Sequence, residues 1–167
     1  MKNLINKFTF NNHQTTKTKL LELIEKTSYI QINNTDKISK TDFYITGLNK
    51  EYIDYIMPYI TDTLKSSLKS FNIEGFEIRN MWFQQYYKND IHKFHNHKYT
   101  HFACVYYVEM FDSIQKTLIK NFGSNDLIEY NAKEGDIIMF PSFLSHSSPI
   151  INTNDRKTII SFNLDIL

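Results

Sequence analysis

Three histidines have the residue type and the spacing that could hold one metal ion. His95 and His97 are separated by a single residue, and side chains at positions i and i+2 of a β-strand point to the same face. His146 opens a later β-like segment and could close a three-ligand set. Such a set leaves coordination positions open for a substrate and for oxygen, which a non-haem iron oxygenase requires. We therefore expect a metal centre formed by His95, His97 and His146.

The other histidines receive weaker interpretations. A lone histidine is more often a surface residue or a packed core residue than a ligand, and His13 and His92 are interpreted in that way. His101 would share the face of His97 if the strand continued through both, so it is a reserve candidate for a ligand. Its spacing favours a place at the wall of the pocket.

Two adjacent cations follow the last histidine. Arg156 and Lys157 lie ten and eleven residues after His146, and either could neutralise the carboxylate of an organic co-substrate. A buried carboxylate needs such a partner because an unpaired buried charge is costly. Strand alternation allows only one of the two cations to face inward.

Length and composition set plain limits. With 167 residues, of which 41% are hydrophobic, the chain can bury a core as one domain over residues 1–167. A net charge of +1 gives no reason to expect nucleic acid binding through bulk electrostatics. No apolar run approaches the roughly 18 residues of a membrane span, and the N-terminus lacks the apolar core of a signal peptide. The single cysteine, Cys104, favours a reducing cytoplasm.

The order of elements indicates a mainly β fold. Helical periodicity predicts helices over residues 16–27 and 49–70, with a kink or a break at Pro58. Short β-branched and aromatic segments, bounded by turns, then predict strands at 78–87, 102–109, 117–121, 128–130, 136–140, 146–151 and 158–164. We expect a helical flank over 1–75 and, over 76–167, a small barrel or double-sheet jelly roll.

Three segments resemble one known family. HNHKYTHFACVYYV, EGDIIMFPSFLSH and RKTIISFN are similar to segments of the small bacterial and phage 2-oxoglutarate- and Fe(II)-dependent oxygenases, which are distant relatives of prolyl hydroxylases. The resemblance covers roughly residues 80 to 165, and residues 41–43 and Trp82 match more weakly. It implies a double-stranded β-helix with a cupin-like barrel, Fe(II) as cofactor and 2-oxoglutarate as co-substrate. It also implies that His95, His97 and His146 are the metal ligands.

The chain departs from the wider superfamily at one ligand. His97 stands where the superfamily has an aspartate or a glutamate, so the negative charge that helps to hold Fe(II) is missing. Three-histidine iron sites are chemically feasible, and the implied site is retained with this difference.

The resemblance leaves two choices for the residue that holds the co-substrate. An ungapped match on Ser161-Phe162-Asn163 selects Lys157, whereas the R-x-S/T pattern selects Arg156 together with Thr158. Tyr86, nine residues before His95, matches a tyrosine that hydrogen-bonds the same carboxylate in prolyl-hydroxylase relatives. Both cations stay open at this point.

The sequence therefore predicts a 2-oxoglutarate- and Fe(II)-dependent dioxygenase that hydroxylates a small molecule or a peptide and releases succinate and carbon dioxide. A cupin-like metalloenzyme or metal-dependent small-molecule-binding protein, with His101 as a fourth ligand, is the first alternative. A non-catalytic jelly-roll binding module is the second. Whether Lys157 or Arg156 points into the barrel separates the first two readings. A homodimer is the expectation from the frequency of dimers among soluble proteins.

Overall fold

The chain folds into two antiparallel sheets with two helices packed against the larger one. The computed structural model describes residues 4–47, 49–112 and 116–167. The helices are α1 (His13–Lys26), α2 (Glu51–Leu68) and the short 3-10 helix η1 (Lys69–Phe71). The strands are β1 (Asn6–Thr9), β2 (Ile30–Asn33), β3 (Lys37–Thr41), β4 (Phe76–Tyr86), β5 (His92–His95), β6 (Phe102–Glu109), β7 (Leu118–Ile119), β8 (Asp136–Pro141), β9 (His146–Ser148) and β10 (Lys157–Ile166).

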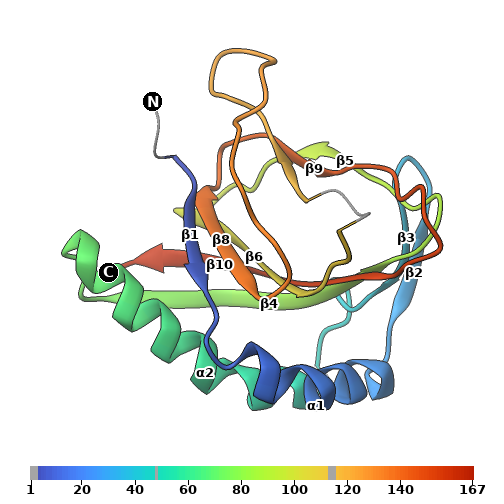
Figure 1. Cartoon of the computed structure of the whole chain (residues 1–167), viewed down its shortest axis with the longest axis horizontal. Coiled ribbons are helices and arrows are strands. Elements are labelled where there is room, and N and C mark those ends of the chain that lie inside the picture. Colours follow the sequence, from blue (N-terminus) through green and yellow to red (C-terminus); the bar gives the residue numbers. More distant parts are fainter. Residues whose placement is uncertain (1–3, 48, 113–115) are drawn as a thin grey trace.

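The two sheets face each other as in a jelly roll. The large sheet has the order β1-β8-β6-β10-β4-β3-β2, and the small sheet has the order β5-β9-β7. The pairings between these strands are antiparallel. Figure 1 shows α1 and α2 along one face of the large sheet and the small sheet over its opposite face. The predicted double-stranded β-helix with N-terminal flanking helices is confirmed.

The large sheet is buried on both faces, which explains the nearly continuous apolar runs of its central strands. Toward the helices, Ile160 and Phe162 of β10 join a cluster that includes Tyr52 of α2. Toward the small sheet, Ile159 and Phe140 belong to a second cluster. Neighbouring residues of β10 thus supply two different cores because strand side chains alternate.

Helix α2 runs through Pro58 as one helix. Its buried residues recur every four positions, so one stripe packs on the sheet; they are Tyr52, Ile56, Ile60, Leu64 and Leu68. Pro58 lies on the exposed side, where the carbonyl that loses its hydrogen bond can reach water. The predicted break into two helices is therefore not observed.

Several predicted elements differ from the observed ones. The flank over residues 1–75 was expected to be helical, yet it contributes β1, β2 and β3 to the large sheet. The strand expected at 128–130 is absent, and nearby only Lys120 and Leu127 form an isolated bridge. The segments expected at 117–121 and 146–151 shorten to β7 and β9. These elements are short, so tertiary pairing decides them more than local pattern does.

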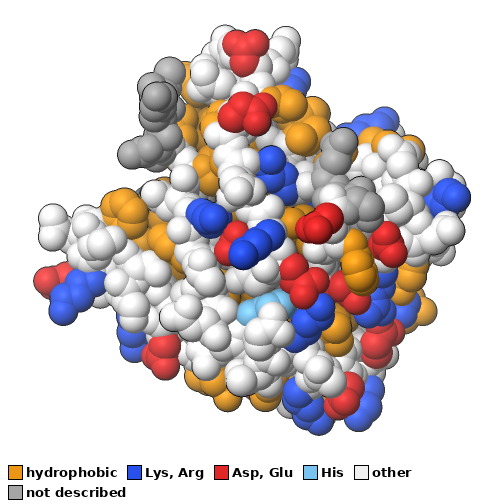
Figure 2. All heavy atoms as spheres, in the orientation of Figure 1, with side chains coloured by type: hydrophobic (Ala, Val, Ile, Leu, Met, Phe, Trp, Pro, Cys, Tyr) orange, Lys and Arg blue, Asp and Glu red, His pale blue; other side chains and the backbone are white. Residues whose placement is uncertain are grey.

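The surface agrees with the near-neutral composition. Figure 2 shows basic and acidic side chains interspersed over the visible face, without a broad area of one sign. No described helix combines the length and the apolar composition that a membrane span needs.

Candidate metal centre and adjoining pocket

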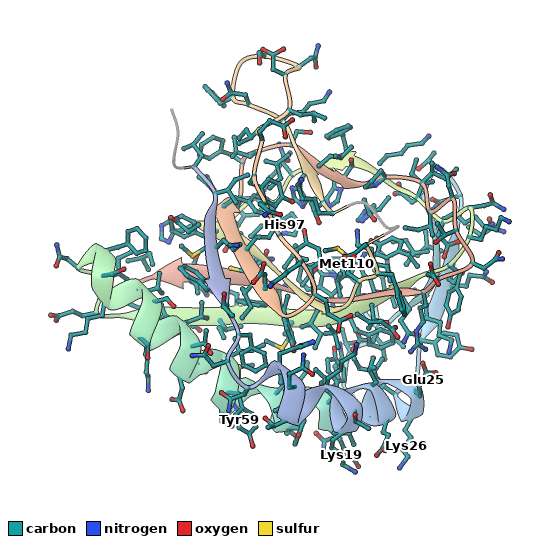
Figure 3. The ribbon with its side chains drawn as sticks, in the orientation of Figure 1. Lys19, Glu25, Lys26, Tyr59, His97 and Met110 are labelled. Carbon is teal, nitrogen blue, oxygen red and sulfur yellow. The ribbon has the colours of Figure 1, made fainter. Side chains whose placement is uncertain are left out.

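Two strands and one loop bring the three predicted histidines together. His95 and His146 are cross-strand partners in the pairing of β5 with β9, so their side chains share one face. His97 lies two residues beyond the end of β5, and its backbone N–H donates to Ser142 O at 2.9 Å. One ring nitrogen from each histidine lies within 4.8 Å of the others. Figure 3 shows His97 in the space between the two sheets.

The hydrogen bonds of these rings leave the same nitrogen available in each. Nδ1 of His95 donates to Lys93 O at 2.8 Å, and Nδ1 of His146 donates to Leu144 O at 3.0 Å. Carbonyl oxygens only accept, so the proton is on Nδ1 and the lone pair is on Nε2. Nδ1 of His97 likewise donates to Asn163 Oδ1 at 2.7 Å. Metal-bound histidines are oriented by this kind of second contact.

The electrostatics of the triad also suit a divalent cation. Burial lowers the pKa of His95 and of His97 and lowers the pKa of His146 to about 3. The three rings are therefore neutral near pH 7 and can act as ligands without first losing a proton. Converging lone pairs in a buried site are stabilised by a cation, so the donor set fits a metal ion.

A fourth histidine lies beside the triad. The His92 ring stacks on the His95 ring, with 3.9 Å between ring centroids, and His92 lines the adjoining pocket. From the sequence alone, His92 is interpreted as a surface residue or a packed core residue, not as part of the site. The separation of three residues would put His92 and His95 on opposite faces of a regular strand. A register shift between them brings both to the same side, and spacing alone does not reveal such a bulge.

His101 lies outside the centre. Its side chain is 62% exposed, and its Nδ1 accepts a hydrogen bond from the Ile166 N–H at 3.1 Å. The fourth ligand of the cupin-like alternative is therefore not in place.

Lys157 is the cation that faces the interior. It is the register partner of Tyr86 on β4, and its Nζ donates to Ser148 Oγ at 3.1 Å. The same Nζ lies 5.6 Å from the ring centroid of Tyr86 and 5.9 Å from that of Tyr107. The side chain is fully buried, and burial lowers its pKa to about 7. A buried amine of this kind gains from an incoming anion.

Arg156 and Thr158 lie on the opposite face of the large sheet. Arg156 Nε donates to Glu109 Oε2 at 2.7 Å, and its Nη1 donates to Glu25 Oε1 at 2.6 Å. Thr158 Oγ1 donates to Glu109 Oε2 at 3.0 Å. Strand alternation turns these two side chains away when Lys157 points inward. Of the two cations, Lys157 is therefore the one that faces the space between the sheets, and Thr158 faces Glu109 on the other side.

Two adjoining cavities surround the triad. The inner cavity has a volume of about 30 Å³ and reaches Tyr86, His146 and Ser148. The outer pocket, of about 700 Å³, opens beside His95 and His97. Trp82 lines both and stacks on His97 with 5.8 Å between ring centroids. Trp82 therefore forms a wall of the site.

Comparisons with known proteins show a similarity of fold. No family model matches the chain, and no curated protein matches it. An oxidoreductase of the 2OG-Fe(II) oxygenase family from Burkholderia pseudomallei is 12% identical, with a TM-score of 0.69 over 89% of this chain and 77% of that one.

Two further solved structures are similar over nearly the whole chain. The viral collagen prolyl hydroxylase of Paramecium Bursaria Chlorella virus-1, in its 2OG complex, is 14% identical, with a TM-score of 0.64 over 98% of this chain and 96% of that one. HygX from Streptomyces hygroscopicus, with nickel, 2-oxoglutarate and hygromycin B bound, is 8% identical, with a TM-score of 0.67 over 99% of this chain and 84% of that one. The chain therefore has the jelly-roll fold of the 2-oxoglutarate- and Fe(II)-dependent oxygenases.

Proposed function

We propose that this chain is a 2-oxoglutarate- and Fe(II)-dependent dioxygenase that hydroxylates a small-molecule or peptide substrate. The observation that carries the proposal is the three-histidine centre, whose available Nε2 atoms converge beside a cavity that ends near the buried amine of Lys157. A metal site alone would also suit other chemistry. The combination with an inward-facing cation suits a metal that works with an anionic co-substrate.

Each residue of the site has a definite role in this proposal. His95, His97 and His146 hold Fe(II), and Asn163 orients the His97 ring. Lys157 holds the distal carboxylate of 2-oxoglutarate, and Ser148 and Tyr86 line that end of the cavity. If bound there, iron and the ketoacid would supply the oxidative chemistry with molecular oxygen as the oxidant: one oxygen atom would enter succinate as 2-oxoglutarate loses carbon dioxide, and the other would hydroxylate a substrate C–H bond.

The protein's own contribution is a dry and oriented site. The buried rings of Tyr86, Tyr107 and Phe140 keep water from the amine and from the metal ligands, which strengthens their electrostatic contacts. The inner cavity of about 30 Å³ is smaller than the ketoacid. Binding therefore requires side chains around the cavity to move, and because 2-oxoglutarate would bind the folded chain and not the unfolded one, we expect it to raise the stability of the fold.

Calorimetry tests this proposal directly. Mn(II) replaces Fe(II) to prevent turnover, and 2-oxoglutarate is then titrated into the loaded protein. His146→Ala should abolish metal binding because it removes a ligand, whereas His101→Ala should leave both binding events unchanged. With Fe(II) and ascorbate, the unmodified protein should convert 2-oxoglutarate to succinate slowly in the absence of substrate. Absence of 2-oxoglutarate binding by the Mn(II)-loaded protein would refute the assignment.

The cupin-like alternative is not supported by the observed geometry, since His101 is exposed and Lys157 points inward. For location we propose the cytoplasm, because the only cysteine of the chain, Cys104, is a buried free thiol and the fold uses no disulfide.

A further inference from the structure

One wall of the outer pocket is the edge of a sheet. β2 is the last strand in the order of the large sheet, and among the described residues no strand pairs with its outer side. Residues 30–34, five in succession, line the outer pocket. Side chains of successive strand residues point to opposite faces, so an unbroken run of lining residues means that the backbone edge itself borders the pocket.

The pairing of β2 with β3 determines which backbone groups point outward. The Lys37 N–H donates to Ile91 O, and the Ile91 N–H donates to Lys37 O, both at 2.8 Å. Lys37 thus directs its backbone groups away from β2, and its pair with Asn33 is of the non-hydrogen-bonded kind. Such pairs alternate with hydrogen-bonded ones in antiparallel ladders.

It follows that Ile32 directs its backbone groups toward β3, while Asn33 and Gln31 direct theirs toward the pocket. The register shift in this hairpin leaves Ser39 and Lys40 opposite Gln31, so the extra residue is on β3 and β2 itself stays regular. The Ser39 N–H accordingly points away from β2, to Asp90 Oδ2 at 2.9 Å. An edge of this kind is a template for pairing with another extended chain.

We propose that the substrate is a peptide, and that an extended segment of it pairs with β2 through the backbone groups of Gln31 and Asn33. This inference rests on the proposed function. The Lys93 N–H donates to Asp36 Oδ1 at 2.8 Å, which ties the tip of the β2–β3 hairpin to β5. Because β5 ends at His95, a peptide on the β2 edge lies beside the metal centre, in the same pocket.

The side chains around the edge indicate the kind of peptide. Phe43 and Tyr44 are 43% and 66% exposed, and the Phe43 ring packs edge-to-face on Trp82 with 4.9 Å between ring centroids. These rings offer an apolar surface to alternate residues of an extended segment. The charged lining residues are one acid and one lysine, Asp36 and Lys98. An uncharged segment with apolar residues at alternate positions therefore fits best.

Peptide binding can be measured through the only tryptophan of the chain, Trp82, which lines the pocket. The probe is a positional library of short uncharged peptides, blocked at both ends and added to protein loaded with Mn(II) and 2-oxoglutarate. The best binder is then methylated at one backbone nitrogen at a time. Strand pairing predicts that every second methyl group weakens binding roughly tenfold, because alternate N–H groups face β2.

A pair of variants tests the edge from the side of the protein. Gln31→Pro removes an outward N–H, and proline is tolerated on an edge strand at such a position. It should weaken peptide binding about tenfold, whereas Gln31→Ala, which keeps the N–H, should leave it unchanged. Both variants should retain Mn(II) and 2-oxoglutarate binding. If Gln31→Pro does not fold, the methylation series on the unmodified protein decides the question.

Other outcomes would overturn the inference. If no peptide of the library binds, or if neither methylation nor Gln31→Pro changes the peptide affinity, then β2 does not bind the substrate. A dimer in sedimentation that Gln31→Pro dissociates, without peptide binding, would show that the edge pairs with a second copy of the chain. In each case intact 2-oxoglutarate binding would leave the proposed function standing, and its loss would refute that function separately.

Discussion

Replacing Lys157 by methionine should make the protein more stable and at the same time remove its proposed co-substrate site. Burial lowers the pKa of Lys157 from 10.5 to about 7. At about 1.4 kcal/mol for each tenfold change in proton affinity, the folded protein disfavours the charged amine by about 5 kcal/mol. Methionine has similar length and no charge, so its burial avoids this cost.

The pH dependence has a definite sign. Between pH 7 and pH 10.5 the unfolded chain holds the proton on Lys157 and the folded chain does not, so the stability of the unmodified protein rises with pH through this window. Below pH 7 both states hold the proton and the cost stays at its maximum. The neighbours facing the amine from β4 and β6, Tyr86 and Tyr107, stay neutral because burial raises their pKa values.

At pH 7 the folded amine is half-protonated, so its cost is about 4 kcal/mol rather than the full value of about 5 kcal/mol. After about 1 kcal/mol is deducted for the lost hydrogen bond to Ser148, Lys157→Met should raise the free energy of unfolding by about 3 kcal/mol. Near pH 10 the two proteins should be almost equally stable. Urea unfolding of the metal-free protein at several pH values measures both. Lys26→Met, at the exposed end of α1 (Figure 3), is the matched control and should change little.

The same variant should lose 2-oxoglutarate binding. Breaking a buried pair between the amine and a carboxylate costs on the order of 3–5 kcal/mol, so calorimetry of the Mn(II)-loaded protein should show at least a hundredfold weaker affinity. In the unmodified protein the affinity should fall about tenfold per pH unit above pH 7, because the carboxylate binds the protonated amine. A methionine variant that is less stable at pH 7, or that binds 2-oxoglutarate normally, would refute this reasoning.

Three further substitutions probe the surroundings of the site. His97→Asp introduces the carboxylate that is commoner at this position, and the variant should bind Fe(II) at least as tightly in anaerobic titration. Weaker Fe(II) binding would indicate that His97 is not a metal ligand. Asn163→Leu removes the acceptor for His97 Nδ1 and should weaken metal binding roughly 10–100-fold in chelator competition. An unchanged metal affinity would show that Asn163 does not orient the His97 ring. Arg156→Ala should leave 2-oxoglutarate affinity unchanged and lower the free energy of unfolding by about 1 kcal/mol, since its ion pairs are partly exposed; loss of co-substrate binding would contradict the observed orientation.

The strands that could be predicted from the sequence are those that are buried on both faces. β4, β6, β8 and β10 are covered by helices on one face and by the small sheet on the other, so their sequences carry dense apolar signals. The helices also follow from the sequence, because their buried residues recur with helical spacing. These elements fix the architecture.

The elements that could not be predicted are short and polar. β1, β2, β3 and β5 have four or five residues each, and their exposed faces carry lysines and asparagines. Such segments become strands only when a partner strand is present. His92 was missed for a related reason, since a bulge in β5 rather than its spacing brings it to the triad.

The choice between Arg156 and Lys157 shows a second limit of prediction from sequence. Two alignments of the same segment differed by one residue, and a slip of one residue moves every side chain of a strand to the other face. The pairing of Lys157 with Tyr86 removes the ambiguity. Register is a property of two strands together, so one strand's sequence does not contain it.

The two faces of β10 tie the stability of the fold to the geometry of the site. One face carries Lys157 and Asn163, while Ile160 and Phe162 on the other face anchor the helices. A truncation such as Phe162→Ala would cost about 3–5 kcal/mol and would reduce function merely by loosening the strand. Loss of function in most variants of β10 therefore has two explanations. In Lys157→Met the expected changes have opposite signs, with higher stability and weaker co-substrate binding, so loosening of the strand cannot account for the result.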